Sequence, residues 1–393
     1  MPDSVKGSFD IPLSVPEIAG NEWDYVKECL DTGWVSSAGG YVTRFEEALR
    51  TYVGADHGVA MVNGTCALQI ALLVAGVEPG DEVVVPALTF IAPVNAVRYV
   101  GAFPVFMDCD QTSLCLDVEK LTEFLTTRTR RAGNGDLLNR DTGRRIRAVV
   151  PVHVFGHPAE MDPLVKLCRE LGLKVIEDAA ESLGSTYRGH QTGTLGDVGV
   201  FSFNGNKLVT TGGGGMLVTN EPSWADLAKH LSTQAKTDPF SYDHDRVGFN
   251  YRLPNVLAAL GVAQMERLDE FIEIKRRNLA SYREALRSIE TFVLLGEAPE
   301  TRSNCWFYTL QVPERSREAL MDHLLKAGIQ VRPIWRPMHE LPMYEHEYSY
   351  RIEVVPRAVR TMFNLPCSVG LSHADIQAVC GCIQEFWEMG ASR

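Results

Sequence analysis

The sequence VIEDAAES at residues 175–182 decides the fold class of this chain. Two β-branched residues that are typical of a buried strand run into Glu177 and Asp178, and small residues follow. In an open sheet of parallel strands, ligands bind in the crevice at the carboxyl ends of the strands. We therefore expect Asp178 to lie at the ligand-binding edge of an α/β sheet.

A second stretch, GVFSFNGNK at residues 199–207, leads into TTGGGG at residues 210–215. Here a strand delivers the hydroxyl of Ser202, a loop delivers Lys207, and four glycines follow. Hydroxyl groups and backbone N–H groups without side chains in the way suit a phosphate. No G-K-[ST] follows the glycines, so they do not form a P-loop. Each feature alone is common, and the order Asp, Ser, Lys and glycine run carries the signal.

Carbonyl–amine chemistry explains why these residue types belong together. A free lysine has a pKa of about 10.4 and is almost fully protonated at pH 7. A cofactor aldehyde fixes the amine of Lys207 as a Schiff base, and the released amine can move a proton between two carbons. Asp178 can hold a proton on a pyridine nitrogen, so that the ring accepts electrons.

The hydrophobic pattern predicts a large α/β domain over residues 1–255 and a smaller α+β domain over residues 256–393. Short apolar segments alternate with amphipathic helices, which indicates a mainly parallel sheet buried on both faces. Strands are expected at 58–61, 83–85, 105–107, 148–154, 174–177, 198–203 and 215–219, and in the second domain at 307–312 and 329–334. Helices are expected at 21–32, 43–52, 65–75, 93–99, 118–124, 163–171, 256–274, 314–327 and 372–389.

Composition excludes several classes of protein. The 393 residues carry a formal net charge of −12, which argues against an extended surface for nucleic acid or anionic membrane. The nine cysteines include no C-x-x-C, the N-terminus shows no signal peptide, and no apolar run is long enough to span a bilayer. His153, His157 and His339 do not follow a metal-ligand spacing, so we expect no metal. A cytoplasmic location is expected.

Residues 126–147 contain seven arginines and look inserted. We interpret this segment as a solvated crossover loop, and a grip on a nucleotide or a partner is the alternative.

The segments EDAA at 177–180 and SF at 202–203, followed by Lys207, resemble the DegT/DnrJ/EryC1/StrS sugar aminotransferases. The resemblance runs from about Ile11 to Trp387. It implies the type I (aspartate aminotransferase-like) fold, in which a large domain with a seven-stranded mixed sheet is joined to a smaller α+β C-terminal domain. It also implies pyridoxal 5'-phosphate (PLP) on Lys207, with Asp178 at its ring nitrogen.

The same resemblance implies further contacts with the cofactor. NGTCAL at 63–68 matches the family's phosphate-binding helix start, and Phe90 matches an aromatic residue that stacks on the pyridine ring. GFNYR at 248–252 matches a motif whose asparagine reaches the cofactor of the neighbouring subunit, so a homodimer with shared sites is expected. Glu181 stands where many relatives have Gln or His. The expected cofactor-binding residues are Gly64, Thr65, Cys66, Phe90, Asp178, Glu181, Ser202, Lys207 and Asn250.

GWVSS at 33–37 and RPIWRPMH at 332–339 are similar to sugar-nucleotide loops of the family. The expected substrate-binding residues are Trp34, Ser36, Ser37, Thr89, Arg252, Arg332, Trp335 and His339. GNEW at 20–23 and NGNK at 204–207 resemble the 4-aminotransferases of bacillosamine and legionaminic acid synthesis.

The resemblance implies ping-pong transfer of an amino group from L-glutamate, which leaves as 2-oxoglutarate, to C4 of a nucleotide-linked 4-keto-6-deoxy sugar. The expected acceptor is UDP-2-acetamido-2,6-dideoxy-hexos-4-ulose, in the synthesis of a cell-surface polysaccharide or lipopolysaccharide. GDP-4-keto-6-deoxymannose, a 3-keto sugar and a PLP-binding regulator without turnover are the alternatives. A nicotinamide-dependent oxidoreductase is disfavoured, since no G-x-G-x-x-G opens a strand–helix turn.

Overall fold

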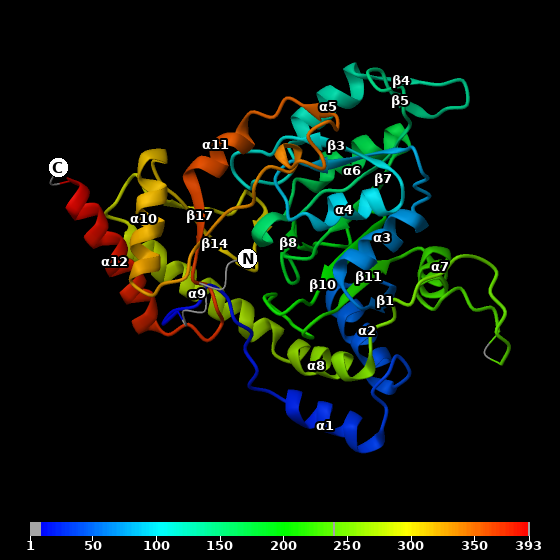
Figure 1. Cartoon of the computed structure of the whole chain (residues 1–393), viewed down its shortest axis with the longest axis horizontal. Coiled ribbons are helices and arrows are strands. Elements are labelled where there is room, and N and C mark those ends of the chain that lie inside the picture. The colour runs from blue at the N-terminus through cyan, green and yellow to red at the C-terminus, as the bar shows by residue number, and fades with distance from the viewer. Residues whose placement is uncertain (1–8, 239, 392–393) are drawn as a thin grey trace.

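The computed structural model describes residues 9–238 and 240–391, and its centre is an eight-stranded mixed sheet (Figure 1). The strands β10, β7, β6, β2, β3 and β16 run parallel, and β11 is antiparallel to both β1 and β10. In spatial order the strands are β1 (His57–Met61), β11 (Gly215–Thr219), β10 (Val198–Ser202), β7 (Lys174–Asp178), β6 (Ile146–Val149), β2 (Glu82–Pro86), β3 (Phe103–Met107) and β16 (Ser349–Tyr350). All seven strands expected for the large sheet are present, and the two-residue β16 was not predicted.

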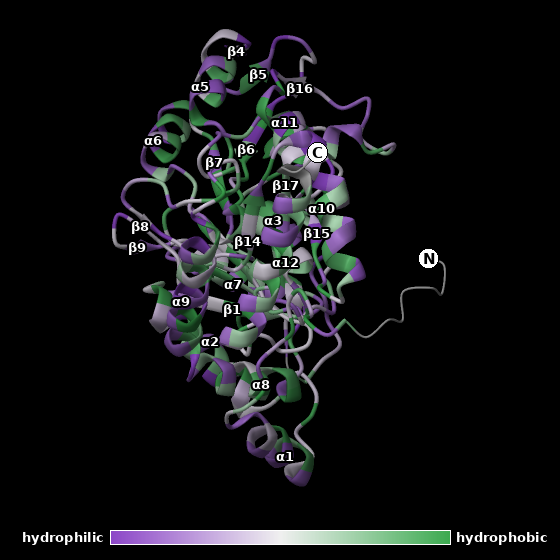
Figure 2. Ribbon diagram, turned by 90° about the vertical axis from the view of Figure 1, so that its left-hand side faces the viewer, coloured by the Kyte–Doolittle hydropathy of each residue, from purple (hydrophilic) through white to green (hydrophobic). Residues whose placement is uncertain are grey.

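Both faces of the sheet are buried, because alternate residues of its strands enter two different cores. In β1, Val59 and Met61 belong to one hydrophobic cluster and Ala60 belongs to the other. Leu217 of β11 likewise faces away from Met216. Side chains that alternate across a strand need cover on both sides. The helices are α2 (Gly40–Val53), α3 (Gly64–Val74), α4 (Ala92–Tyr99), α5 (Val118–Thr127), α6 (Met161–Leu171), α7 (Pro222–Ser232) and α8 (Asn255–Met265). Figure 2 shows the apolar residues concentrated inside this layered body.

The C-terminal part forms a second, four-stranded sheet on the left of Figure 1. Its strands, in spatial order, are β12 (Val293–Leu294), β14 (Tyr308–Gln311), β17 (Met362–Leu365) and β15 (Arg332–Pro333). Its helices are α9 (Leu268–Leu286), α10 (Glu314–Lys326), α11 (Val354–Thr361) and α12 (His373–Ala391). Because α8 packs on α1 (Glu22–Thr32) and α2, and β16 joins the large sheet, the boundary at residue 255 stays a prediction.

Two helices differ from their predicted form. The expected helix 256–274 is broken at Glu266 and Arg267, where α8 ends and α9 begins. In α1, Trp23 and Leu30 recur at helical spacing but are exposed, at 77% and 61%. The buried face instead carries Glu22, whose carboxylate accepts hydrogen bonds from Gly20 N (2.7 Å) and Gln264 Nε2 (2.6 Å). The helix is therefore fastened by polar contacts that hydrophobic periodicity does not reveal.

The arginine-rich segment forms a hairpin of β4 (Thr129–Arg131) and β5 (Leu137–Asn139), at the top right of Figure 1. Several of its arginines are engaged within the chain. Arg128 pairs with Asp141, Arg145 pairs with Asp81, and the guanidinium of Arg144 lies 3.6 Å from the centre of the Phe103 ring. Because these arginines already have partners within the chain, the contacts favour a solvated crossover loop over a nucleotide-binding segment.

Within the described part of the chain, none of the helices combines the length and the apolar character that a bilayer crossing requires.

Candidate active site

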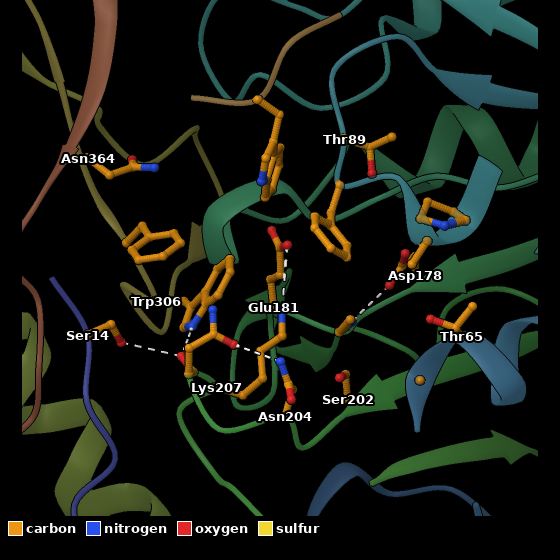
Figure 3. A pocket seen from close by; sticks show the side chains of 18 of the residues that line it. Ser14, Thr65, Thr89, Asp178, Glu181, Ser202, Asn204, Lys207, Trp306 and Asn364 are labelled. Atoms are coloured by element: carbon orange, nitrogen blue, oxygen red, sulfur yellow. Dashed lines mark hydrogen bonds and ion pairs between the residues drawn. The ribbon is translucent and has the colours of Figure 1, made fainter. Parts of the chain in front are cut away.

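A cavity of about 430 Å³ opens where β7 and β10 end and the C-terminal sheet approaches them (Figure 3). This volume lies in the usual range of small-molecule sites. Ten of the residues expected from the sequence line it together: Gly64, Thr65, Thr89, Phe90, Asp178, Glu181, Ser202, Lys207, Arg332 and Trp335. The stretches 175–182 and 199–207 thus meet in one place, as the rule for strand ends predicts.

Asp178 is the last residue of β7, and only 4% of it is exposed. Its Oδ1 accepts a hydrogen bond from Ala180 N at 3.1 Å, which leaves Oδ2 available to a donor in the cavity. Burial raises the pKa of this carboxyl, and the Ala180 hydrogen bond and the charge of Lys207 oppose the rise. A carboxylate in this position needs a cationic partner, which a protonated ring nitrogen supplies.

A buried network behind Asp178 fixes the end of β7. Ala159 N donates to Nδ1 of His153 at 3.0 Å, so Nε2 carries the hydrogen and donates to Glu177 at 2.9 Å. Glu177 also accepts from the backbone N–H groups of Gly193, Leu195 and Gly196. His153 is thus a structural residue here. The residues that the structure describes contain no group of His, Cys, Asp and Glu side chains that could hold a metal.

Lys207 reaches the cavity from the turn after β10, where its N–H donates to Asn204 O at 2.9 Å. Its Nζ lies 3.6 Å from Oε1 of Glu181 and 3.9 Å from the centre of the Trp306 ring. Burial lowers the pKa of this amine, and the charges of Glu181 and Asp178 oppose the change. A lysine with a lowered pKa has a larger neutral fraction, which is the form that attacks an aldehyde.

The start of α3 forms a second side of the cavity. Asn63 Oδ1 caps the helix by accepting from Cys66 N at 2.8 Å, and the N–H groups of Gly64 and Thr65 remain without an acceptor in the described chain. A Cβ at position 64 would lie 2.9 Å from Cβ of Ser202, so only glycine fits here. Free N–H groups and hydroxyls at a helix N-terminus bind phosphate well.

Cys66 and Ala67 of this motif do not line the cavity, and the N–H of Cys66 is used by the helix cap.

These residues fit PLP. Thr65, Ser202 and the start of α3 would hold its phosphate, and Asp178 would hold its ring nitrogen. Phe90 is 54% exposed at the cavity and offers a free ring face, and the buried Oγ1 of Thr89 has no hydrogen-bond partner in the described chain. When bound, PLP supplies an aldehyde that carries the amino group and a ring that accepts electrons.

Two loop motifs lie outside the cavity within one chain. Arg252 is already paired, since its Nη1 donates to Glu46 Oε1 at 2.7 Å and to Ala60 O at 3.0 Å. Asn250, two residues earlier, is exposed. The expected contact of Arg252 with substrate therefore lacks support here, whereas the side chain of Asn250 remains open to a second chain.

The loop at 33–37 is also remote from Lys207. Its backbone is fastened to the start of α8, where Asn255 Nδ2 donates to Trp34 O and Asn255 N donates to Ser36 O, both at 2.7 Å. Trp34 is 58% exposed and lines a separate hollow between α1 and α2, and Ser36 and Ser37 are exposed. The cavity lining likewise leaves out His339, which packs beside Phe106.

Sequence reasoning missed the cavity residues that the N-terminal segment, the lysine loop and the C-terminal sheet supply: Ser14, Asn204, Asn206, Trp306, Phe307, Gln330 and Asn364. Trp306 is tied to the lysine loop, because its Nε1 donates to Asn206 O at 2.9 Å. Asn364 interrupts the apolar strand β17 and accepts from Thr309 Oγ1 at 2.7 Å. A polar residue inside an apolar strand was the one available signal.

Comparison with known proteins identifies the family to which this fold belongs. Residues 16–384 match the DegT/DnrJ/EryC1/StrS aminotransferase family. The chain is 39% identical to a GDP-perosamine synthase of Caulobacter vibrioides, over 95% of this chain and 98% of that protein. It is 38% identical to EpsN of Bacillus subtilis, described as a putative pyridoxal phosphate-dependent aminotransferase, over 87% and 86% of the two chains.

Solved structures of aminotransferases have the same fold. A Brucella abortus aminotransferase of this family superposes with a TM-score of 0.86 at 29% identity, over 93% of this chain and 95% of that chain. DesV of S. venezuelae superposes with a TM-score of 0.83 at 31% identity, over 93% and 94%. The chain therefore belongs to the DegT/DnrJ/EryC1/StrS aminotransferase family, and it is a PLP-dependent sugar aminotransferase of the type I fold.

Proposed function

We propose that this enzyme moves the amino group of L-glutamate to C4 of GDP-4-keto-6-deoxymannose. Three relatives named GDP-perosamine synthase are 39%, 37% and 36% identical over 95–96% of this chain. The UDP-linked acceptor expected from the sequence is not confirmed. That expectation rested on the short segments at 20–23 and 204–207, whereas similarity over the whole chain favours a GDP-linked sugar. The UDP sugar is the second candidate.

One observation carries the proposal: a buried lysine amine and a buried strand-end carboxylate face the same cavity beside an open helix N-terminus. In this proposal Lys207 takes and returns the proton that moves between carbons, and Asp178 holds the proton of the ring nitrogen. Gly64, Thr65 and Ser202 anchor the phosphate. Each group thus acts at a fixed atom within a preorganised site.

Arg332 is assigned to the substrates. Of the charged side chains that line the cavity, it is the one that makes no hydrogen bond or ion pair within the described chain. A ping-pong enzyme admits its two substrates to one site in turn. L-Glutamate and a nucleotide sugar share negative charge, on carboxylates and on a diphosphate respectively. A guanidinium binds either group with paired N–H donors.

A homodimer with shared sites completes the proposal. Near Asn250, the loop 240–252 carries Phe240, Tyr242 and Val247, which are 93%, 90% and 85% exposed. Large apolar side chains exposed together are typical of an interaction surface. A second copy that covers them would also receive Asn250 at its cofactor. The nine unpaired cysteines suit a cytoplasmic enzyme.

A panel of acceptors tests the reaction. The enzyme is incubated with PLP, L-glutamate and one keto sugar at a time, and 2-oxoglutarate is measured. GDP-4-keto-6-deoxymannose should give the highest kcat/KM. A preference for the UDP-linked sugar or a 3-keto sugar would move the assignment to that substrate. Cofactor binding without 2-oxoglutarate from any sugar would contradict the proposed reaction and indicate a regulator.

A further inference from the structure

The Nζ atom of Lys207 lies between a carboxylate and an aromatic face that come from different parts of the chain. Oε1 of Glu181, in the loop after β7, is 3.6 Å away, and the centre of the Trp306 ring, just before β14, is 3.9 Å away. Figure 3 shows both side chains converging on the lysine. A carboxylate and the face of an indole share one preference, since both attract a cation.

Glu181 is held so that one oxygen points at the amine. Its Oε2 accepts a hydrogen bond from Phe155 N at 2.8 Å, and the residue is 5% exposed. The ionisable groups that face it are Lys207, Asp178 and Cys115. Burial raises the pKa of Glu181 to about 7, while the charge of Lys207 opposes the rise. The carboxylate is therefore available to a cation at neutral pH and above.

Trp306 is held at three points. Its indole Nε1 donates to Asn206 O, its backbone N donates to Asn304 Oδ1 at 2.9 Å, and its carbonyl accepts from Nζ of the buried Lys275 at 2.8 Å. Trp306 is 3% exposed, and its ring cannot swing away from the lysine without breaking the Nε1 hydrogen bond. The Nε1 bond thus fixes the indole ring relative to the backbone of Asn206, directly before Lys207. The face of the ring is thereby kept next to the lysine amine.

We propose that Glu181 and Trp306 form a binding site for the ammonium group of Lys207, which the lysine occupies while its nitrogen is protonated and not bonded to the cofactor. Amino transfer frees this nitrogen while the amino group is in transit. In this site the amine, once it has taken the proton from one carbon, is held as an ammonium out of bulk solvent until it returns that proton. A glutamine at position 181 could keep the Phe155 hydrogen bond but would lack the charge. The inference rests on the role of Lys207 in the proposed function.

The test measures the pKa of Lys207 without any turnover. The full-length protein is freed of cofactor and labelled with a trace of acetic anhydride from pH 6 to 11, and acetylation of the peptide that contains Lys207 is followed by mass spectrometry. Glu181→Gln should move the midpoint of labelling to lower pH by about one unit or more, because an opposite charge at this distance raises a lysine pKa by that amount. Trp306→Leu should move it the same way by less, and Trp306→Phe by least.

Glu160→Gln, a change of an exposed carboxylate at the start of α6, is the matched control and should leave the midpoint in place. A Glu181→Gln midpoint equal to or above that of the parent would overturn the proposal. If that variant fails to fold by circular dichroism, an unchanged midpoint in Trp306→Leu overturns it instead. The labelling needs no sugar, so a wrong acceptor would leave this result intact.

Discussion

The strand-end cluster (Asp178, Glu181, Ser202 and Lys207) and Asn250 of the loop 240–252 are both predicted to contact the cofactor, yet only the cluster lines the cavity of one chain. The four residues line the cavity, and their two carboxylates, Asp178 and Glu181, are buried and hydrogen-bonded to the backbone. The loop carries exposed aromatic side chains, and Asn250 has its side chain in the open. This difference is what the proposed homodimer requires, since Asn250 of a second copy would then complete the site.

Removal of the lysine should have the largest effect. Lys207→Ala deletes the only amine in the strand-end cluster, so we expect amino transfer from L-glutamate to fall to background while the fold persists. Single-turnover formation of 2-oxoglutarate measures this. Lys166→Ala, an exposed lysine on α6, is the control. Activity in Lys207→Ala close to that of the parent would show that the cluster is misassigned.

Asp178→Asn comes next. The amide keeps the size of the side chain but cannot hold a protonated ring nitrogen, so we expect kcat to fall by about a thousandfold or more with the cofactor still bound. Bound PLP and kcat are measured together, with Asp226→Asn, an exposed residue of α7, as the control. An unchanged kcat contradicts the assigned role.

Mixed dimers test directly whether Asn250 acts in the site of its own chain or in that of the partner. Asn250→Ala should lower activity about 100-fold, because the cofactor phosphate in the other subunit would lose a hydrogen bond. Equal amounts of Lys207→Ala and Asn250→Ala are exchanged and assayed. One site of each hybrid dimer is intact, so about a quarter of the parent activity should return. No recovery, with hybrids confirmed by mass spectrometry, would place the loop in its own chain's site.

Arg332→Ala should raise KM for both substrates by about tenfold or more and change kcat less, since it removes a charge-assisted contact made in both half-reactions. Arg336→Ala, an exposed arginine four residues later, is the control. A change of KM for one substrate alone would restrict Arg332 to that substrate.

The smallest expected effect concerns stability and pH. The folded protein holds the proton of Glu181 up to a pKa of about 7, against an ordinary value of 4.5. The group therefore stabilises the fold at low pH, and this contribution is lost as pH rises through that window. The Glu181→Gln variant has no ionisable group at this position. The difference between its Tm and that of the parent, both free of cofactor, should therefore increase from pH 5 to pH 8. A flat or falling difference contradicts the raised pKa.

The sequence predicted the parallel strands and the strand-end cluster because both depend on local patterns. Strand ends of one sheet meet at one edge, so Asp178 and Ser202 could be brought together without coordinates. The helix α7 and the short β16 were missed, and the predicted helix 256–274 is in fact two helices. A break between well-formed helical segments leaves little trace in periodicity.

Apart from Arg332 and Trp335, the C-terminal wall of the cavity could not be predicted. Trp306, Gln330 and Asn364 come from separate segments, and their position depends on how the second sheet packs against the first. Trp23 and Leu30 recur at helical spacing in the predicted helix 21–32, yet both are exposed. Contacts with a second chain leave the same apolar signal in a sequence as contacts within one chain.

An absorbance spectrum of the purified protein with PLP, recorded before and after addition of L-glutamate, tests the central claim most directly. The account predicts a visible band from the bond between Lys207 and the cofactor aldehyde, which glutamate discharges and which Lys207→Ala lacks. A colourless protein that takes up no PLP, or a band that survives both glutamate and the loss of Lys207, would contradict it.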